Sequence, residues 1–128
     1  MTVDKVVDAS VLVAFAFGEP QHDRARDLLS DVHILAPNLV LYELANAAVK
    51  KINAEPANRE KFLDSLGVAL RLQIDLRRVP ATPTAELALR AGLTAYDAAY
   101  LYLALDLDLP LLTFDTTLDC AYQTIARS

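Results

Sequence analysis

The chain has 128 residues, 54% of them hydrophobic, with 17 acidic and 12 basic residues and a formal net charge of −5. A chain of this length can bury about two-thirds of the surface that it exposes when unfolded, so we expect residues 1–128 to form one domain. The apolar runs are shorter than the roughly 18 residues of a membrane span, and the N-terminus lacks the features of a signal peptide. These features predict a cytoplasmic protein with no membrane contact.

The cysteine and histidine content excludes two kinds of site. A single cysteine, Cys120, cannot form an internal disulfide, and His22 and His33 do not have the spacing of a zinc site. Core packing is the ordinary role of a lone cysteine, and we expect it for Cys120.

The first half of the chain is predicted to alternate strands with helices. A buried strand ends at Asp8, Pro37 stops a second strand, and Asn38 is placed to cap the helix after it. The residues of HDRARDLLSDV have helical spacing, which predicts a surface helix between the two strands. In chain order, the expected elements are a strand over 5–7, a helix over 22–32, a strand around 34–35 and a helix over 39–52.

The second half continues this alternation. Gly92 is placed to end one helix and Thr94 to cap the next. Because strands and helices alternate, we expect an α/β fold with a mainly parallel central sheet. In chain order, the expected elements are a helix over 57–71, a strand over 74–79, helices over 83–91 and 95–107, a strand over 110–114 and an edge strand over 122–125.

Four acidic residues lie inside or at the ends of apolar runs. They are Asp8 in VVDASVLV, Glu43 in LVLYELANAAV, Asp97 in LTAYDAAYLYLA and Asp115 in LLTFD. An ionised carboxylate in apolar surroundings is strongly disfavoured unless it is paired with a cation or binds a metal. Carboxylate oxygens suit Mg²⁺ or Mn²⁺, and such clusters commonly serve phosphoryl chemistry on a nucleotide backbone. We therefore interpret the four acids as a metal site.

The expected topology allows the four acids to converge. Asp8 ends the first strand and Asp115 directly follows the last predicted parallel strand, so the two carboxylates meet if these strands are neighbours. Glu43 and Asp97 lie near the starts of helices, which also fall at the carboxyl ends of parallel strands when each helix follows a strand. Ligands of such sheets bind at this edge.

Each carboxylate also has a possible structural role that needs no metal. Asp97 is placed to complete a capping box with Thr94, and Asp115 and Asp8 are each placed to cap a following segment. Glu43 has the weakest such explanation, because the nearest lysine is too far along the helix for an i, i+4 pair. Capping and metal binding do not exclude one another.

The acidic net charge opposes long-range attraction to a polyanion. Without the four candidate ligands, 13 acidic residues stand against 12 basic ones, and two divalent cations would neutralise the site itself. Global charge therefore decides little. A basic track is one interpretation of the remaining cations, and solvated surface charge is the other. The candidates for the track are Arg71, Arg77, Arg78, Arg90, Lys50 and Lys51.

Four segments together resemble the PIN domain, and in particular the VapC-like toxins of toxin–antitoxin pairs. They are VVDASVLV, LYELANAAVK, TAYDAAYLYLAL and PLLTFDTTL, in the order and spacing of that family. The resemblance covers nearly the whole chain and implies a single-domain α/β/α sandwich. It places Asp8, Glu43, Asp97 and Asp115 at the family's acidic metal-binding positions.

The resemblance also suggests roles for residues around the acids. Ser10 and Thr113 match hydroxyl residues that orient a carboxylate or a metal-bound water in this family. Asp119, one helical turn past Asp115, is either a further acid of the site or an ordinary surface acid.

Tyr100, like its neighbours Tyr96 and Tyr102, is expected in core and interface packing, although Tyr96 is placed to reach a substrate groove.

The function expected from these features is a Mg²⁺- or Mn²⁺-dependent endoribonuclease. Asp8, Asp97 and Asp115 would hold one or two ions, and Glu43 would bind through water or act as a general base. The family further implies an RNA substrate, a cognate antitoxin that inserts a basic side chain among the acids, and a homodimer. The apolar faces of 42–49 and 62–70 are candidate surfaces for those partners.

Two other functions were considered. A metal- or RNA-binding module of this fold without catalysis differs from the enzyme only in turnover. A receiver-like or phosphatase-like domain would need a lysine at a strand end close to a phospho-accepting aspartate, and no lysine lies near Asp97 or Asp115. The nuclease is therefore the preferred prediction.

Overall fold

The computed structural model describes residues 1–127 and has a four-stranded sheet at its centre. All three strand pairings are parallel, and the order of the strands is β3-β2-β1-β4. This confirms the predicted α/β fold with a parallel sheet. The strands are β1 (Val3–Val7), β2 (Val32–Pro37), β3 (Ile74–Arg77) and β4 (Leu111–Leu112).

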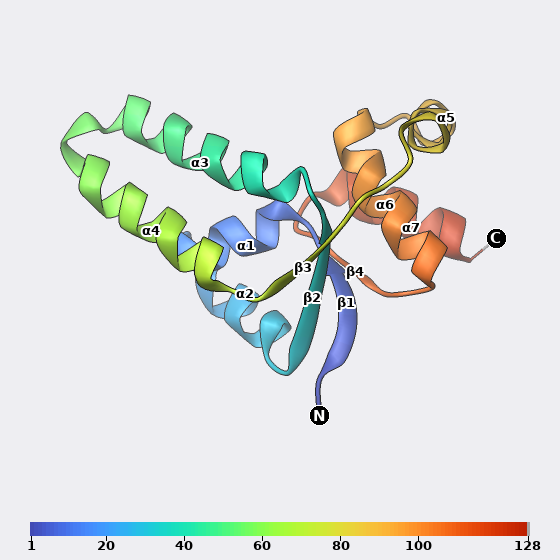
Figure 1. Ribbon diagram of the computed structural model, residues 1–128, viewed down its shortest axis with the longest axis horizontal. Helices are drawn as coiled ribbons and strands as arrows, with labels where there is room; N and C mark the ends of the chain where they lie inside the picture. The colour runs from blue at the N-terminus through green and yellow to red at the C-terminus, as the bar shows by residue number, and fades with distance from the viewer. Residues whose placement is uncertain (128) are drawn as a thin grey trace.

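Helices cover the sheet from both sides, as an α/β/α sandwich requires. Figure 1 shows α1 to α4 on one side of the strands and α5 to α7 on the other. One short 3-10 turn, Pro56–Asn58, joins α3 to α4. The helices are α1 (Ala9–Ala16), α2 (His22–Leu29), α3 (Val40–Ala54), α4 (Arg59–Arg71), α5 (Ala81–Ala91), α6 (Ala95–Leu107) and α7 (Thr116–Ala126).

The core forms where the sheet meets α1, α3 and α6. Val6 and Val7 of β1 are fully buried because helices cover both faces of this central strand. Helix α6 packs against β1 and β2, and its largest buried side chain is Tyr100. The site residues described below therefore lie beside the main apolar core.

Helices α3 and α4 form a pair that extends away from the sheet (Figure 1). A second, smaller apolar cluster holds this pair to α1, and its buried members are Phe17, Ala48 and Phe62. The phenylalanine rings lie 6.4 Å apart between centroids. This packing fixes the position of α3, which carries Glu43.

Two predicted features of local structure are wrong. Asn38 does not cap α3: its N–H donates to the carbonyl of Arg77 at 3.0 Å, which extends the β2–β3 pairing, and α3 begins only at Val40. The segment 122–125 is the end of α7 rather than an edge strand. Leu118 and Ile125, seven residues apart, both face the core, which is a helical spacing.

Cys120 also departs from its expected place. It lies exposed on α7, whereas Leu118 on the same helix is fully buried. The inward face of α7 is already taken by residues with helical spacing, so the cysteine faces outward. Among the described residues, no helix has both the length and the apolar character needed to cross a membrane.

Candidate functional site

The carboxyl ends of β1 and β4 bring Asp8 and Asp115 to the same edge of the sheet. Val7 pairs with Leu112 across these neighbouring strands, and the Asp8 N–H donates to the Leu112 carbonyl at 3.0 Å. The chain passes from β1 to β2 on one side and reaches β4 on the other, so this is where the strand order reverses. The predicted meeting of the two strand ends is confirmed.

Two hydroxyl groups hold the Asp8 carboxylate. Ser10 Oγ donates to Asp8 Oδ1 at 2.5 Å, and Thr113 Oγ1 donates to Oδ2 at 2.7 Å. The same hydroxyls accept backbone N–H groups of the last strand-to-helix turn: Ser10 Oγ from Phe114 and Thr113 Oγ1 from Asp115, both at 2.9 Å. Asp8 is thereby fixed in orientation.

Asp8 is the most buried of the four acids, with 5% of its surface exposed. Burial raises the pKa of its carboxyl group, and the hydrogen bonds from Ser10 and Thr113 oppose that rise. It also caps α1, since its side chain accepts the N–H of Ser10 at 3.0 Å. Asp8 thus has the structural role considered from the sequence and faces the site as well.

Glu43 reaches the cluster from α3 and is bonded to a buried tyrosine. The hydroxyl of Tyr100, a residue only 1% exposed, donates to Glu43 Oε1 at 2.5 Å. Burial raises the pKa of Glu43, the Tyr100 bond lowers it, and the negative charges of Asp8 and Asp97 raise it further. Burial and the charge of Glu43 likewise raise the pKa of Tyr100 above its usual range.

Tyr100 is the site residue that sequence reasoning missed. It was expected only in packing, and its ring is indeed in the core, but its hydroxyl is the partner of Glu43. The available signal was its spacing, because Asp97 and Tyr100 are three residues apart and so share a face of α6. By contrast, Tyr96 is 67% exposed and does not pack in the core.

Asp97 and Asp115 both lie at helix starts. The Asp97 N–H donates to Thr94 Oγ1 at 3.1 Å, and the Leu118 N–H donates to Asp115 Oδ1 at 3.1 Å. The pKa of Asp97 is raised, first by burial and then by the charge of Asp115. Thr94 therefore caps α6 and Asp115 caps α7, and the charge of Asp115 also acts on Asp97.

Electrostatic coupling links all four acids into one group, here called the rim cluster: Asp8, Glu43, Asp97 and Asp115. Glu43 interacts with Asp8 and Asp97, and Asp97 interacts with Asp115. Within residues 1–127, none of the four forms an ion pair with a lysine, arginine or histidine. Asp119 bonds through its backbone to Asp115 but contributes to none of these couplings.

The rim cluster was compared with what a divalent cation requires. Its carboxylate and hydroxyl oxygens are the donors that Mg²⁺ and Mn²⁺ prefer. However, no three acidic, histidine or cysteine side chains of residues 1–127 are arranged as a ready-made ligand set. The donor chemistry fits a cation, whereas binding by this conformation requires water ligands or rotation of a side chain. Mg²⁺ commonly keeps several waters in its sites.

A cleft with a volume of about 560 Å³ opens beside the rim cluster. Ser10 and Glu43 lie in its wall together with Phe114, the residue before Asp115. Helix α1 and the turn after it form one wall, and α3 forms the other. Of the four acids, Glu43 thus lines the groove between the two helices, next to Ser10, which holds Asp8.

Comparison with known proteins gives a consistent result. Residues 5–122 match the model of the PIN domain family. The chain is 33% identical over 125 residues to a protein of Pyrobaculum aerophilum named Exonuclease VapC9, covering 92% of this chain and 85% of that relative.

Two solved structures have the same fold. PAE2754 from Pyrobaculum aerophilum matches with a TM-score of 0.75 and 28% identity, over 98% of this chain and 95% of its own. VapC20 of Mycobacterium tuberculosis, a Sarcin-Ricin loop cleaving toxin, matches with a TM-score of 0.67 over 93% and 95% of the two chains, but at 16% identity it supports the fold alone. The chain therefore belongs to the PIN-domain family, as its four acidic segments predict.

Proposed function

We propose that this protein is a metal-dependent endoribonuclease that hydrolyses phosphodiester bonds of RNA and acts as the toxin of a toxin–antitoxin pair. The observation that supports this most is the rim cluster itself. Four carboxylates without a cation partner are held at the switch point of a parallel sheet, and the pKa values of Asp8, Glu43 and Asp97 are raised. Strongly perturbed acids in a cleft are typical of functional sites.

Mg²⁺ or Mn²⁺ is the cofactor proposed for this site, with Asp8, Asp97 and Asp115 as its ligands. When bound, such an ion makes water more acidic and neutralises negative charge on a phosphate. Ser10 and Thr113 keep both oxygens of Asp8 directed, so this ligand does not have to be ordered when an ion binds.

Glu43 is the proposed general base. The pKa of Glu43 is raised toward neutral pH, and a general base is most effective when its pKa lies near the working pH. The bond from Tyr100 holds one carboxylate oxygen and leaves the other available to the attacking water. We therefore propose that Tyr100 positions the base and does not itself react.

The names of the relatives leave the mode of cleavage to be decided for this chain. VapC9 is named an exonuclease, and VapC20 is described as cleaving a loop. We propose internal cleavage for this chain, the mode that the description of VapC20 gives for that protein. A circular RNA separates the two modes, since an exonuclease cannot cut it.

The experiment is cleavage of total cellular RNA and of a circular RNA by the purified protein, with Mg²⁺ or Mn²⁺ and with EDTA. We expect discrete fragments and linearised circles from the wild type, and no products with EDTA or from the Asp97→Asn variant. Mononucleotides from linear RNA with intact circles would show an exonuclease. Equal cleavage by Asp97→Asn, checked to be folded by circular dichroism, would contradict the proposed site.

A non-catalytic RNA- or metal-binding module is the second candidate. One observation favours its RNA-binding form: within residues 1–127 the acids do not form a ready-made three-ligand set for a catalytic metal. Absence of turnover on every RNA tested, from a protein that binds Mn²⁺ at the rim cluster, would support this candidate over the enzyme.

A cognate antitoxin and a homodimer are the proposed protein partners. Apolar side chains are exposed on both faces expected from the sequence: Tyr42 is 77% and Val49 is 52% exposed on α3, and Leu70 is 50% exposed on α4. Phe62, in contrast, points inward and packs against Phe17. The two helices thus offer apolar surface at the outer side of the extended pair, where partner contacts can be tested.

A further inference from the structure

The cleft beside the rim cluster carries a cation on each of its sides. Lys50 on α3 lines one wall, and Arg24 on α2 reaches the opposite side, where its guanidinium carbon lies 5.1 Å from the centre of the Phe114 ring. Phe114 itself lines the cleft and directly precedes Asp115. Lys50 therefore shares the cleft with Glu43, and Arg24 lies against the residue that precedes Asp115.

Neither of these cations is neutralised within the described chain. Arg24 and Lys50 are exposed and have no carboxylate partner within residues 1–127. Their neighbours differ: Arg26 is paired with Asp23 and Asp27, and Lys51 with Glu19. Among the cations near the cleft, Lys50 lines it and Arg24 packs against its lining residue Phe114, and both are without an ion pair in the described chain.

Helix geometry sets the distance between Lys50 and the site. Lys50 follows Glu43 by seven residues, so both lie on the same face of α3, separated by about 10 Å of helix rise. A strand whose phosphate lies at the acids can therefore present another phosphate to the lysine. On the other side, the Arg24 guanidinium is pre-ordered against an aromatic ring, which lowers the entropy lost when it binds a phosphate.

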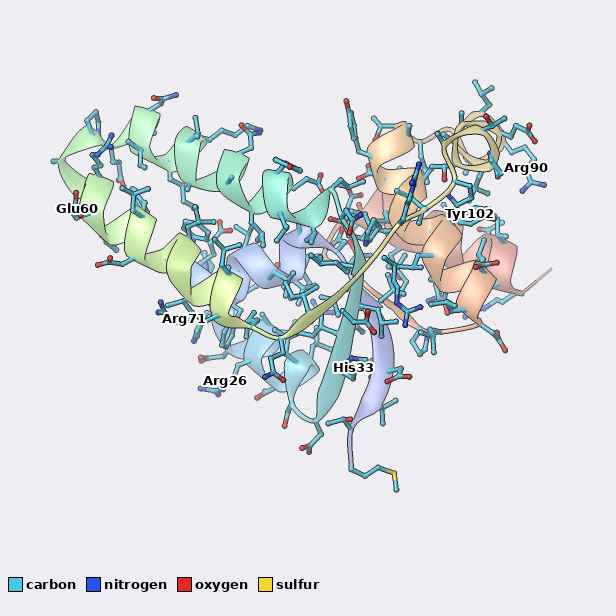
Figure 2. All side chains as sticks on the ribbon, in the orientation of Figure 1. Arg26, His33, Glu60, Arg71, Arg90 and Tyr102 are labelled. Carbon is cyan, nitrogen blue, oxygen red and sulfur yellow. The ribbon has the colours of Figure 1, made fainter. Side chains whose placement is uncertain are left out.

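The candidate basic track drawn from the sequence does not form. Figure 2 labels Arg71 at the end of α4 and Arg90 on α5, on opposite sides of the strands. Arg77 donates two hydrogen bonds to Asp75. Of the six residues in that candidate track, Lys50 is the one that lines the cleft at the acids.

We propose that Arg24 and Lys50 bind backbone phosphates of a single-stranded RNA on either side of the bond placed at the rim cluster. This inference rests on the proposed function, because it assigns the substrate path of that same site. The cleft lining combines apolar side chains such as Val13 and Ala47 with the amides of Gln21 and Asn46 and with Glu19, which is paired with Lys51. Binding through phosphates is independent of sequence and depends on salt.

The test compares Arg24→Gln and Lys50→Gln with two controls that lose the same charge elsewhere. Arg26→Gln lies on the same helix as Arg24, on the outer side of α2 (Figure 2). Lys61→Gln removes an exposed lysine that, like Arg24, lies over a phenylalanine ring, here that of Phe62 on α4. Affinity for a fluorescently labelled oligouridylate is measured against salt concentration in the Asp97→Asn background, and KM and kcat in the wild-type background.

We expect each cleft variant to bind the oligouridylate about fivefold more weakly at moderate salt, and the controls to bind as the parent does. The slope of log affinity against log salt should fall by about 0.7 for each lost phosphate contact. In the active protein, KM should rise while kcat is kept, because a phosphate away from the cut bond contributes equally before and during reaction.

Unchanged affinity in both cleft variants, equal losses in the controls, or no binding by the parent would each overturn the proposal. The first result, together with lost binding of a protein partner, would assign the cleft to that partner. If the wild type does not cleave RNA, the proposed function fails, but binding by the Asp97→Asn protein still decides whether the two cations contact phosphates.

Discussion

Two groups of acids in this molecule have opposite electrostatic surroundings. The rim cluster lies at the carboxyl end of the sheet, partly or fully buried, and its acids have no cation partner among residues 1–127. Asp4, His33, Asp75 and Arg77 lie side by side on β1, β2 and β3 and form what we call the strand cluster. There, Arg77 donates to both oxygens of Asp75 at 2.9 and 3.0 Å, and His33 Nδ1 lies 2.8 Å from Asp4 Oδ1.

The pKa shifts of the two clusters have opposite signs. Asp75, bonded to Arg77, has its pKa lowered, whereas burial raises the pKa values of Asp8, Glu43 and Asp97. Repulsion from neighbouring acids raises the pKa values of Glu43 and Asp97 further. The charge of a carboxylate that is paired with an arginine is already neutralised, so the carboxylate attracts a metal ion less. Carboxylates whose charge has no cation partner remain available to a metal ion. This difference distinguishes a candidate site from a surface ion pair.

The largest expected difference between the clusters is in activity. Asp97→Asn should reduce RNA cleavage about 1,000-fold or more, because a charged ligand is replaced by a neutral group of equal size. Asp75→Asn should leave cleavage unchanged. Gel analysis of the fragments from both variants at equal protein concentration checks this. Comparable losses in the two variants would remove the distinction between the clusters.

A metal ion should raise the Tm of the wild type by several degrees, and substitutions in the two clusters should change this increase differently. Mg²⁺ at about 100 times its dissociation constant should stabilise the wild type by about 2.7 kcal/mol, since it binds only the folded state. The Asp75→Asn variant should respond equally, and Asp97→Asn should respond weakly. Thermal denaturation with and without Mg²⁺ measures this, with NaCl of matched ionic strength as control. A response to Mg²⁺ that Asp97→Asn retains in full would place the ion elsewhere.

Tyr100→Phe tests whether the tyrosine positions Glu43. Loss of the hydroxyl should lower kcat about tenfold with little change in KM, because Glu43 loses its fixed orientation. The bond from Tyr100 lowers the Glu43 pKa, so its removal should raise that pKa and move the acidic limb of the pH–rate profile upward. Tyr102→Phe, in the same helix, is the control. A profile that does not move would reduce Tyr100 to a packing residue.

The smallest expected effects concern stability without metal, and their signs should oppose each other. The pKa of Asp97 is raised by folding, so its ionisation destabilises the folded state above pH 4; Asp97→Asn should therefore raise Tm at pH 7, by about 3 °C. The pKa of Asp75 is lowered by folding, so its charge stabilises the folded state there, and Asp75→Asn should lower Tm slightly.

The Asp97 effect should be lost by the time the pH falls below the ordinary aspartate value of 3.8, because its raised folded-state pKa lies above that value. The Asp75 effect should fade only below 3.8, as the pH falls through its lowered folded-state pKa. Thermal melts in EDTA at pH 7 and at acidic pH measure the two signs. If both substitutions changed Tm in the same direction at pH 7, the two carboxylates would not contribute to folding stability with opposite signs.

The sequence by itself predicted most of the fold and the four acids. Alternating apolar strands and helices are local patterns, and Gly92 with a φ of 69° and Thr94 end and cap helices where expected. The acids were recognisable because an ionised carboxylate within an apolar run is rare without a purpose. Asp8 and Asp115 needed only the assumption that their strands are neighbours.

Only the tertiary structure decided what each of these groups contacts. Asn38 was expected as a cap because that preference is local, but a hydrogen bond to Arg77 on another strand outweighed it. Tyr100 and Glu43 are 57 positions apart, and Arg24 and Phe114 come from opposite ends of the chain. Local sequence fixes which face a side chain occupies, whereas contacts between distant segments depend on how helices pack on the sheet, and those contacts determine which charges remain without a partner.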